Sequence, residues 1–386
     1  MKPTLAAVLM AALLACPAGA ASEDFYAAAP HELHGRAGSL IKAEPITPPP
    51  GAASAYRLLY RSTGLKGESV AVSGVVAIPA AGTAGDRPVV SWAHPTAGIA
   101  DACAPSKRAD VFERVPGIAN LLGQGVIVVG TDYAGLGTDG VHPYLIGPSE
   151  GHAVLDAARA VRTLPDAGAG SRLVVSGYSQ GGHAALWAGK LARSYAPDLH
   201  LVGIAAIAPP TELGTILRAD LGGRAGKVLS AFALSSWSQL YDIPVDSVLK
   251  DKVELVLGRV AKDCTETFQD TLRVIADEAP FEREGFLDAD VTVTQPWRGL
   301  IESNTPAVTP ADVPVLIAQG AADSIVQPLV TSLYMDELCA HGVPVEFVLE
   351  PRAEHTDMPA RSADAVTDWI ARRLAGAPAR TDCKAR

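Results

Sequence analysis

Short apolar runs alternate with helix-like segments along most of the 386-residue chain. Two runs of alternating apolar and polar residues, 56–62 and 69–78, predict an antiparallel pair of strands. Shorter runs rich in β-branched residues predict buried strands at 89–93, 126–131, 173–176, 201–207, 315–319 and 345–349. Apolar residues at helical spacing lie near 150–164, 181–195, 329–341 and 362–374. This order predicts a mostly parallel eight-stranded sheet with helices on both faces.

One long segment, residues 209–310, interrupts the alternation. It contains KVLSAFALSSWSQLY, whose apolar residues fall near one face of a helix. The segment predicts a helical cap or lid inserted between two parts of one core, residues 21–208 and 311–386. Two interpretations of its apolar face stay open: the core of a fixed cap, or a mobile lid that meets lipid or acyl chains. An antiparallel start, a parallel continuation and this insertion describe the α/β-hydrolase fold.

The N-terminus predicts a targeting segment. Lys2 precedes an apolar run over residues 5–15, and Ala18-Gly19-Ala20 fits a cleavage site, so residues 1–20 are expected to be a signal peptide. The run is too short to span a bilayer as a helix. The mature protein is therefore expected to be secreted or periplasmic. Lipoprotein anchoring at Cys16 is the alternative, which the residues before it fit less well.

Charge and cysteine content narrow the function classes further. The chain has 32 basic and 42 acidic residues, a net charge of −10, and no basic run, which argues against nucleic acid as a partner. Removal of the signal peptide leaves an even number of cysteines, which predicts two disulfides in any of three pairings: Cys103, Cys264, Cys339 and Cys383. No C-x-x-C or H-E-x-x-H motif is present, so neither a metal nor an organic cofactor is expected.

A candidate nucleophile, Ser179, lies between an apolar strand and a helix-like run. The stretch GYSQG at 177–181 fits G-x-S-x-G, the corner that exposes a serine hydroxyl at the end of a strand. A second match, at 147–151, lacks a long β-branched strand before it, and Pro148 restricts its backbone. Ser149 is therefore expected to cap a helix rather than to act as a nucleophile.

A serine nucleophile needs a base and an orienting carboxylate, which follow it in this fold, each after a strand. Asp323 follows the run 315–319, and His355 follows the run 345–349. They are the predicted acid and base. Asp357 is a rival acid, but it lies only two residues from the histidine that it would have to orient.

The oxyanion of an acyl-transfer intermediate needs N–H donors. The residue after the nucleophile, Gln180, is expected to supply one. The other is expected from Thr96 or Ala97, in the loop after the strand at 89–93. His94 in the same loop is expected to be structural, because it precedes the predicted acid and base in the chain.

Three stretches resemble the secretory lipase family, which comprises the fungal lipase-A type and its bacterial relatives. They are CAPS at 103–106, TDYAGLGTDGVHPYLIGPSEGHAVLDAARA from 131 and GYSQGGHAALWA from 177. The resemblance implies an α/β-hydrolase with a helical cap, ester-hydrolysing activity, and disulfides Cys103–Cys264 and Cys339–Cys383. Residue by residue, it places the triad at the same serine, aspartate and histidine. The chain departs from the family where bacterial relatives read H-G-T, because it has Pro95 between the histidine and the threonine.

The expected function is a secreted serine ester hydrolase (a lipase or esterase) acting on lipophilic acyl esters. A lipid surface is a candidate contact of the cap, and no obligate protein partner is inferred. Two alternatives stay open. One is an exported serine peptidase on the same fold, which an acidic cluster from Glu254, Asp263 and Glu266 would favour. The other is a non-catalytic surface-binding protein, which the intact triad disfavours.

Overall fold

The computed structural model describes residues 23–82, 85–220, 223–250, 253–284 and 286–384. The expected signal peptide and Cys16 lie outside these residues. Among the described helices, none combines the length and apolar character needed to cross a bilayer.

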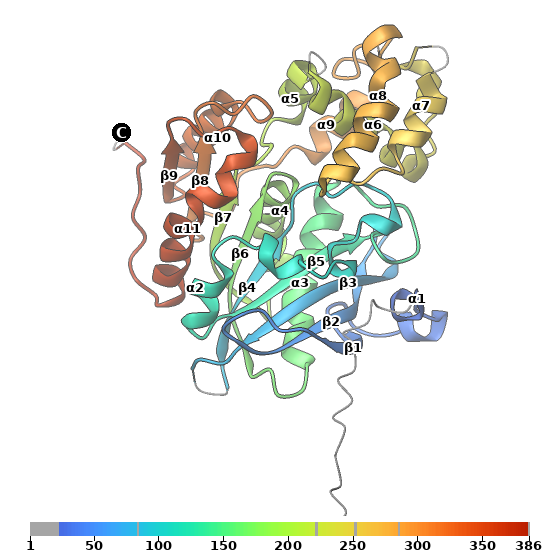
Figure 1. The fold of residues 1–386 in the computed structure, drawn as a ribbon. Helices are drawn as coiled ribbons and strands as arrows, with labels where there is room; N and C mark the ends of the chain where they lie inside the picture. Colours follow the sequence, from blue (N-terminus) through green and yellow to red (C-terminus); the bar gives the residue numbers. More distant parts are fainter. Residues whose placement is uncertain (1–22, 83–84, 221–222, 251–252, 285, 385–386) are drawn as a thin grey trace, which may run out of the picture.

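A nine-stranded sheet forms the centre of the molecule, in the order β1-β2-β3-β5-β4-β6-β7-β8-β9 (Figure 1). Neighbouring strands are antiparallel from β1 to β5 along this order and parallel from β5 to β9. The strands are β1 (Leu40–Ile46), β2 (Ala52–Thr63), β3 (Ser69–Pro79), β4 (Arg87–Ala93), β5 (Ile127–Ala134), β6 (Ala169–Tyr178), β7 (His200–Ile207), β8 (Val315–Gly320) and β9 (Val345–Glu350). The α/β-hydrolase prediction is correct in class and topology.

The predicted number of eight strands is wrong by one. The additional strand, β1, comes from a segment that reads as a proline-rich leader, and it pairs antiparallel with β2. Pro45 lies inside it, opposite Tyr56. Proline is compatible with a strand at the edge of a sheet, where its missing N–H leaves no ladder partner unpaired.

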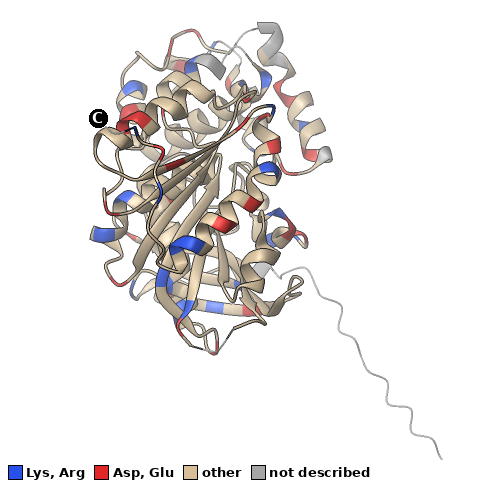
Figure 2. Cartoon of the chain, turned by 90° about the vertical axis from the view of Figure 1, so that its left-hand side faces the viewer, with Lys and Arg blue, Asp and Glu red and all other residues tan. Residues whose placement is uncertain are grey.

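Helices cover both faces of the sheet and bury one core on each side. The helices α3 (Gly147–Thr163), α4 (Gln180–Tyr195) and α10 (Pro328–Ala340) pack on one face. The helices α2 (Ile118–Gly123) and α11 (Met358–Leu374) pack on the other. Alternate residues of a strand therefore enter different cores: Ala93 faces the first and Trp92 the second. Basic and acidic residues are interspersed over the side seen in Figure 2.

Five helices lie between β7 and β8 and gather at one end of the sheet (Figure 1). They are α5 (Leu213–Asp220), α6 (Arg224–Tyr241), α7 (Val253–Val260), α8 (Phe268–Glu284) and α9 (Trp297–Asn304). These helices and the described segments that join them are called the helical insertion below. The insertion has its own core, which includes the buried side chains of Phe232, Trp237, Phe281 and Trp297. Since β7 pairs directly with β8, the insertion leaves and re-enters the sheet at neighbouring strands.

Short elements complete the chain: the helix α1 (Glu23–Tyr26) and the 3-10 turns η1 (Pro30–Leu33), η2 (Asp101–Cys103), η3 (Pro105–Lys107), η4 (Val111–Arg114), η5 (Val245–Ser247) and η6 (His355–Asp357). Two disulfides join distant parts, Cys103 with Cys264 and Cys339 with Cys383. This is the pairing that the family resemblance implies. The second disulfide holds the C-terminal tail beside β9, where Asp382 N–H donates to Val345 O at 2.7 Å.

Candidate active site

The chain reverses sharply at Ser179, between the end of β6 and the start of α4. The serine backbone has φ 55° and ψ −119°, a conformation that residues with a side chain rarely adopt. Its N–H donates to Ile207 O on the neighbouring strand at 2.9 Å, which helps to hold the corner in place. The strained corner projects the hydroxyl beyond the carboxyl end of the sheet.

Both glycines of the corner are required by close backbone contacts. A Cβ atom at Gly177 would lie 2.0 Å from Gly181 O, and a Cβ at Gly181 would lie 1.9 Å from Ala93 O. Both distances are far inside van der Waals contact, so any side chain here would force the strand and helix apart. The G-x-S-x-G spacing therefore has a steric cause in this molecule.

Ser179, His355 and Asp323 form one hydrogen-bonded chain. His355 Nε2 lies 2.9 Å from Ser179 Oγ, and its Nδ1 lies 2.8 Å from Asp323 Oδ2. In the neutral ring, Nδ1–H donates to the carboxylate and Nε2 accepts from the serine hydroxyl. The Tyr178 hydroxyl donates to His355 O at 2.8 Å, which fixes the histidine backbone behind the nucleophile.

The Asp323 carboxylate is buried and held by several donors. Its Oδ1 accepts the N–H groups of Ile325 and Val326 at 2.9 and 2.8 Å, and its Oδ2 accepts from Gln319 Nε2 at 3.1 Å. Asp357, the rival acid, instead accepts the Glu354 N–H at 3.3 Å. Only Asp323 of the two is hydrogen-bonded to the His355 ring.

The loop after β4 carries the other predicted oxyanion donors. His94 Nδ1–H donates to Pro95 O at 2.5 Å, and the Tyr133 hydroxyl donates to His94 O at 2.9 Å. The Thr96 hydroxyl lies 2.8 Å from the Tyr144 hydroxyl. In the described chain, the N–H groups of Thr96, Ala97 and Gln180 have no hydrogen-bond acceptor. These three N–H groups stay the candidate oxyanion donors, and His94 contacts the backbone of the same loop.

A buried carboxylate, Glu150, lies behind the nucleophile and was not predicted as part of the site. Its Oε1 accepts from Leu145 N and Gln180 Nε2 at 3.0 and 2.8 Å, and its Oε2 lies 2.7 Å from His183 Nδ1. His183 Nε2 lies 2.8 Å from Asn304 O, at the end of the helical insertion. Glu150 thus fixes the side chain of the residue whose N–H is a predicted oxyanion donor.

The prediction that Ser149 caps its helix is wrong. The helix α3 begins at Gly147, with Ile146 at the N-cap, and Ser149 is buried within its first turn. Pro148 explains the earlier start, because proline is favoured in the first helical turn, where its missing N–H costs no hydrogen bond. The second G-x-S-x-G match therefore forms a helix start and not a strand–helix corner.

Burial lowers the pKa of the His142 ring to about 4. The neutral ring suits its contacts, because Nδ1–H donates to Ala134 O at 2.9 Å and Nε2 accepts from Gln180 Nε2 at 3.1 Å. The unfolded chain takes up a proton near pH 6.5, whereas the folded protein does so only near pH 4. The unfolded state therefore binds more protons between these values, and stability falls as the pH falls through them.

We expect this group to remove about 3 kcal/mol of unfolding free energy between pH 6.5 and 4. Burial also raises the pKa of Asp156 to about 6, which gives a slope of opposite sign. Urea unfolding of the wild type and His142→Asn across this range separates the two, because Asp156 is common to both proteins. As the pH falls, the free energy of unfolding of the wild type should decrease more steeply than that of the variant. Equal slopes would show that the His142 ring does not cause the pH dependence.

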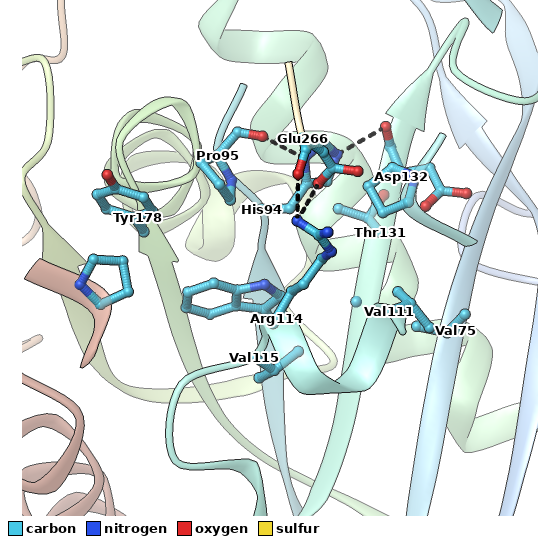
Figure 3. A pocket seen from close by; sticks show the side chains of 14 residues that line it. Val75, His94, Pro95, Val111, Arg114, Val115, Thr131, Asp132, Tyr178 and Glu266 are labelled. Atoms are coloured by element: carbon cyan, nitrogen blue, oxygen red, sulfur yellow. Dashed lines mark hydrogen bonds and ion pairs between the residues drawn. The ribbon is translucent and has the colours of Figure 1, made fainter. Parts of the chain in front are cut away.

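A cavity of about 170 Å³ lies on the α2–α11 side of the sheet (Figure 3). Trp92 and Tyr178 line it, and Arg114 points across it towards Glu266, whose pKa is raised by burial. Ser179 is not among its lining residues. Of the acidic residues that would favour a peptidase, Glu254 is exposed and Glu266 lies beside two arginines, whereas Asp263 is buried, and burial together with Asp277 raises its pKa to about 6. In the described part of the chain, no group of three or more His, Cys, Asp or Glu side chains could hold a metal ion.

The sheet order and the serine corner after β6 define the class of the protein as an α/β-hydrolase. The fold is similar to that of Candida antarctica lipase A in its closed state, with a TM-score of 0.76 and 22% identity, over 95% of this chain and 89% of that chain. Lipase A of Moesziomyces aphidis is 27% identical over 326 residues, 78% of this chain and 68% of the relative. A probable inactive lipase of Mycobacterium tuberculosis is 26% identical over 344 residues, 85% of this chain and 75% of the relative.

The Secretory lipase family matches residues 113–382, well over half of the chain. The protein belongs to this family, and it is a carboxylic-ester hydrolase.

Proposed function

We propose that this protein is an exported lipase or esterase that cleaves lipophilic carboxylic esters through an acyl-enzyme on Ser179. The observation that carries the proposal is the continuous hydrogen-bonded chain from Ser179 Oγ through the His355 ring to the buried Asp323 carboxylate. A serine hydroxyl becomes a nucleophile when such a base accepts its proton and a carboxylate stabilises the resulting imidazolium.

In the first half-reaction, His355 Nε2 takes the hydroxyl proton while Ser179 Oγ attacks the ester carbonyl carbon. The Gln180 N–H and a Thr96 or Ala97 N–H receive the developing oxyanion. The intermediate collapses, and the imidazolium gives its proton to the leaving alcohol. Water, deprotonated by the same nitrogen, then attacks the acyl carbonyl and releases the carboxylic acid, which restores the serine. Asp323 stays ionised throughout.

The helical insertion offers apolar side chains to a lipophilic substrate or a lipid surface. Several large hydrophobic residues of the insertion are exposed, and Leu255 is 80% exposed: Tyr241, Leu255, Leu272, Ile275 and Val293. A contiguous patch of exposed apolar side chains commonly marks a binding surface in soluble proteins, so the proposal requires that these side chains act together. Residues 1–20 would direct export and then be removed, and the two disulfides suit an oxidising compartment.

The experiment combines substrate range with identification of the reacting serine. We expect hydrolysis of p-nitrophenyl esters from acetate to palmitate, with an optimum that reports the length of the acyl pocket. A fluorophosphonate should label one peptide, the one that contains Ser179, and should leave the Ser149 peptide unmodified. An aminoacyl p-nitroanilide series tests the peptidase alternative. Cleavage of anilides without cleavage of any ester would overturn the proposal.

A further inference from the structure

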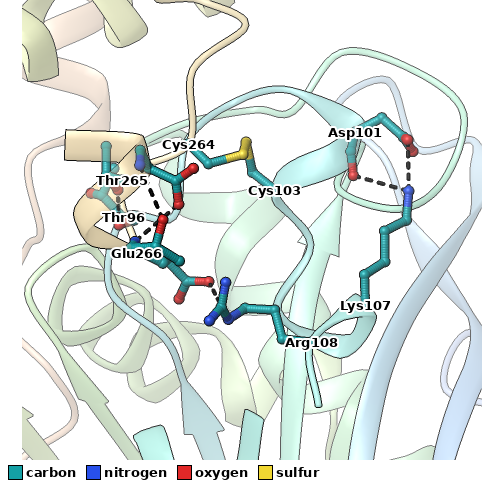
Figure 4. Close-up of a disulfide and its surroundings, with 10 residues drawn as sticks. Thr96, Asp101, Cys103, Lys107, Arg108, Cys264, Thr265 and Glu266 are labelled. Atoms are coloured by element: carbon teal, nitrogen blue, oxygen red, sulfur yellow. Dashed lines mark hydrogen bonds and ion pairs between the residues drawn. A yellow bond between two sulfur atoms is a disulfide. The ribbon is translucent and has the colours of Figure 1, made fainter. Parts of the chain in front are cut away.

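A short segment of the helical insertion, residues 264–266, runs alongside the loop 94–98 after β4 (Figure 4). Gly98 and Cys264 form an isolated antiparallel β-bridge. The Cys103–Cys264 disulfide joins the same segment to the core, with 5.3 Å between the two Cα atoms. The insertion is therefore bonded directly to the loop that carries the predicted oxyanion donors.

Thr265 makes two hydrogen bonds to this loop. Its N–H donates to Ala97 O at 3.0 Å, and its hydroxyl donates to Thr96 O at 2.7 Å. Both bonds engage carbonyl oxygens and leave the N–H groups of the loop unengaged. The hydroxyl bond is the one that depends on the identity of the side chain, because any residue other than proline could supply the backbone bond.

The orientation of a peptide unit is set by either of its polar ends. In a trans peptide, the carbonyl of one residue and the N–H of the next point in opposite directions. The Thr265 hydroxyl, by holding Thr96 O, therefore turns the Ala97 N–H away from the segment 264–266. His94 acts in the same way one peptide earlier: by holding Pro95 O, it sets the direction of the Thr96 N–H. Of these two peptides, only the one between Thr96 and Ala97 is held by the insertion.

We infer that Thr265 is a positioning residue of the oxyanion hole, through which the helical insertion takes part in catalysis. The inference rests on the proposed function and takes the Ala97 N–H as the second oxyanion donor, because the Thr265 hydroxyl holds the peptide between Thr96 and Ala97. Without the hydroxyl, the peptide between Thr96 and Ala97 can rotate and offer its carbonyl to the intermediate. The transition state is then less stabilised, whereas the bound ground-state ester is unaffected.

The test compares Thr265→Val, which removes the hydroxyl, with Thr265→Ser, which keeps it, in the full mature protein. Thr271→Val is the matched control, because the Thr271 hydroxyl also donates to a backbone carbonyl in the insertion (Thr267 O, 3.0 Å) but does not touch the loop. The measurements are kcat and KM for a p-nitrophenyl ester, the inhibition constant of an alkyl trifluoromethyl ketone, which forms an oxyanion on the serine, and the thermal midpoint. Thr265→Ala replaces the valine variant if valine does not fold.

We expect Thr265→Val to lower kcat and ketone affinity about tenfold at unchanged KM, less than the roughly 10²–10³-fold that loss of an entire donor costs. Thr265→Ser and Thr271→Val should stay within about twofold of the wild type, as substitutions without a role in positioning do. Unchanged kcat and ketone affinity in Thr265→Val would overturn the inference, as would an equal loss in Thr265→Ser. Wild-type ester hydrolysis and labelling at Ser179 would leave the proposed function intact in either case.

Discussion

Alanine in place of Ser179 is expected to lower kcat for ester hydrolysis by roughly 10⁴–10⁶-fold. The variant keeps His355, Asp323 and the oxyanion donors but has no atom that can form the acyl-enzyme. Residual activity should come only from water attacking the polarised carbonyl. The stability of the variant should be close to that of the wild type, because the alanine Cβ occupies the position of the serine Cβ at the same corner.

Two further variants make this result specific. Ser149→Ala, within the first turn of α3, should retain kcat within about twofold, as expected for a site outside the catalytic groups. The double variant Ser179→Ala/His355→Ala should be no slower than Ser179→Ala alone, because groups that act as a unit lose their effect together. Steady-state kinetics on one p-nitrophenyl ester measures all three. Additive losses in the double variant would show that the histidine acts independently of the serine.

Removal of the Glu150 carboxylate is expected to destabilise the protein by about 4 kcal/mol. Glu150→Ala removes the acceptor of the Leu145 N–H, the acceptor of His183 Nδ1 and one of the two acceptors of the Gln180 amide. Leu145 has φ 53°, so its N–H bond to Glu150 also holds a backbone conformation that leucine avoids. For a chain of this length, the loss corresponds to a fall of about 5 °C in the thermal midpoint.

Glu150→Gln serves as the conservative variant, since it keeps one oxygen for the Leu145 and Gln180 donors. It should recover part of the lost stability. Glu302→Ala is the surface control, because Glu302 is 60% exposed and pairs only with the exposed Arg298; its thermal midpoint should not change. Differential scanning calorimetry of the three variants measures the shifts. A Glu150→Ala midpoint equal to that of Glu302→Ala would show that the buried contacts contribute nothing.

The sheet could be predicted because its buried strands are short, apolar and β-branched, so that local pattern and final environment agree. The edge strand β1 could not be predicted in the same way. None of its side chains is fully buried, and Pro45 reads locally as a turn or leader residue. Only its pairing with β2 makes it a strand, and that pairing depends on residues outside the segment.

The order of Ser179, Asp323 and His355 was predicted because each follows a strand, and the carboxyl ends of parallel strands meet at one edge of a sheet. The Glu150 cluster follows no such rule. Its members Leu145, Gln180, His183 and Asn304 come from a loop, from α4 and from the helical insertion, and no spacing in the sequence relates them. One signal was available: in both G-x-S-x-G matches, the residue after the serine is polar and lies at the start of a helix whose later residues are largely apolar.

The direct pairing of β7 with β8 bears on how such an enzyme can diversify. Because the helical insertion departs from one strand and returns on its neighbour, its length and sequence can change without disturbing the register of the sheet. Natural variation or recombination could then replace the helices of the insertion while the sheet stays in place. The bonds of Thr265 to the loop after β4 limit that freedom. A transplanted insertion would have to bring a hydroxyl to the same carbonyl, or the hybrid would bind its new substrate and turn it over slowly.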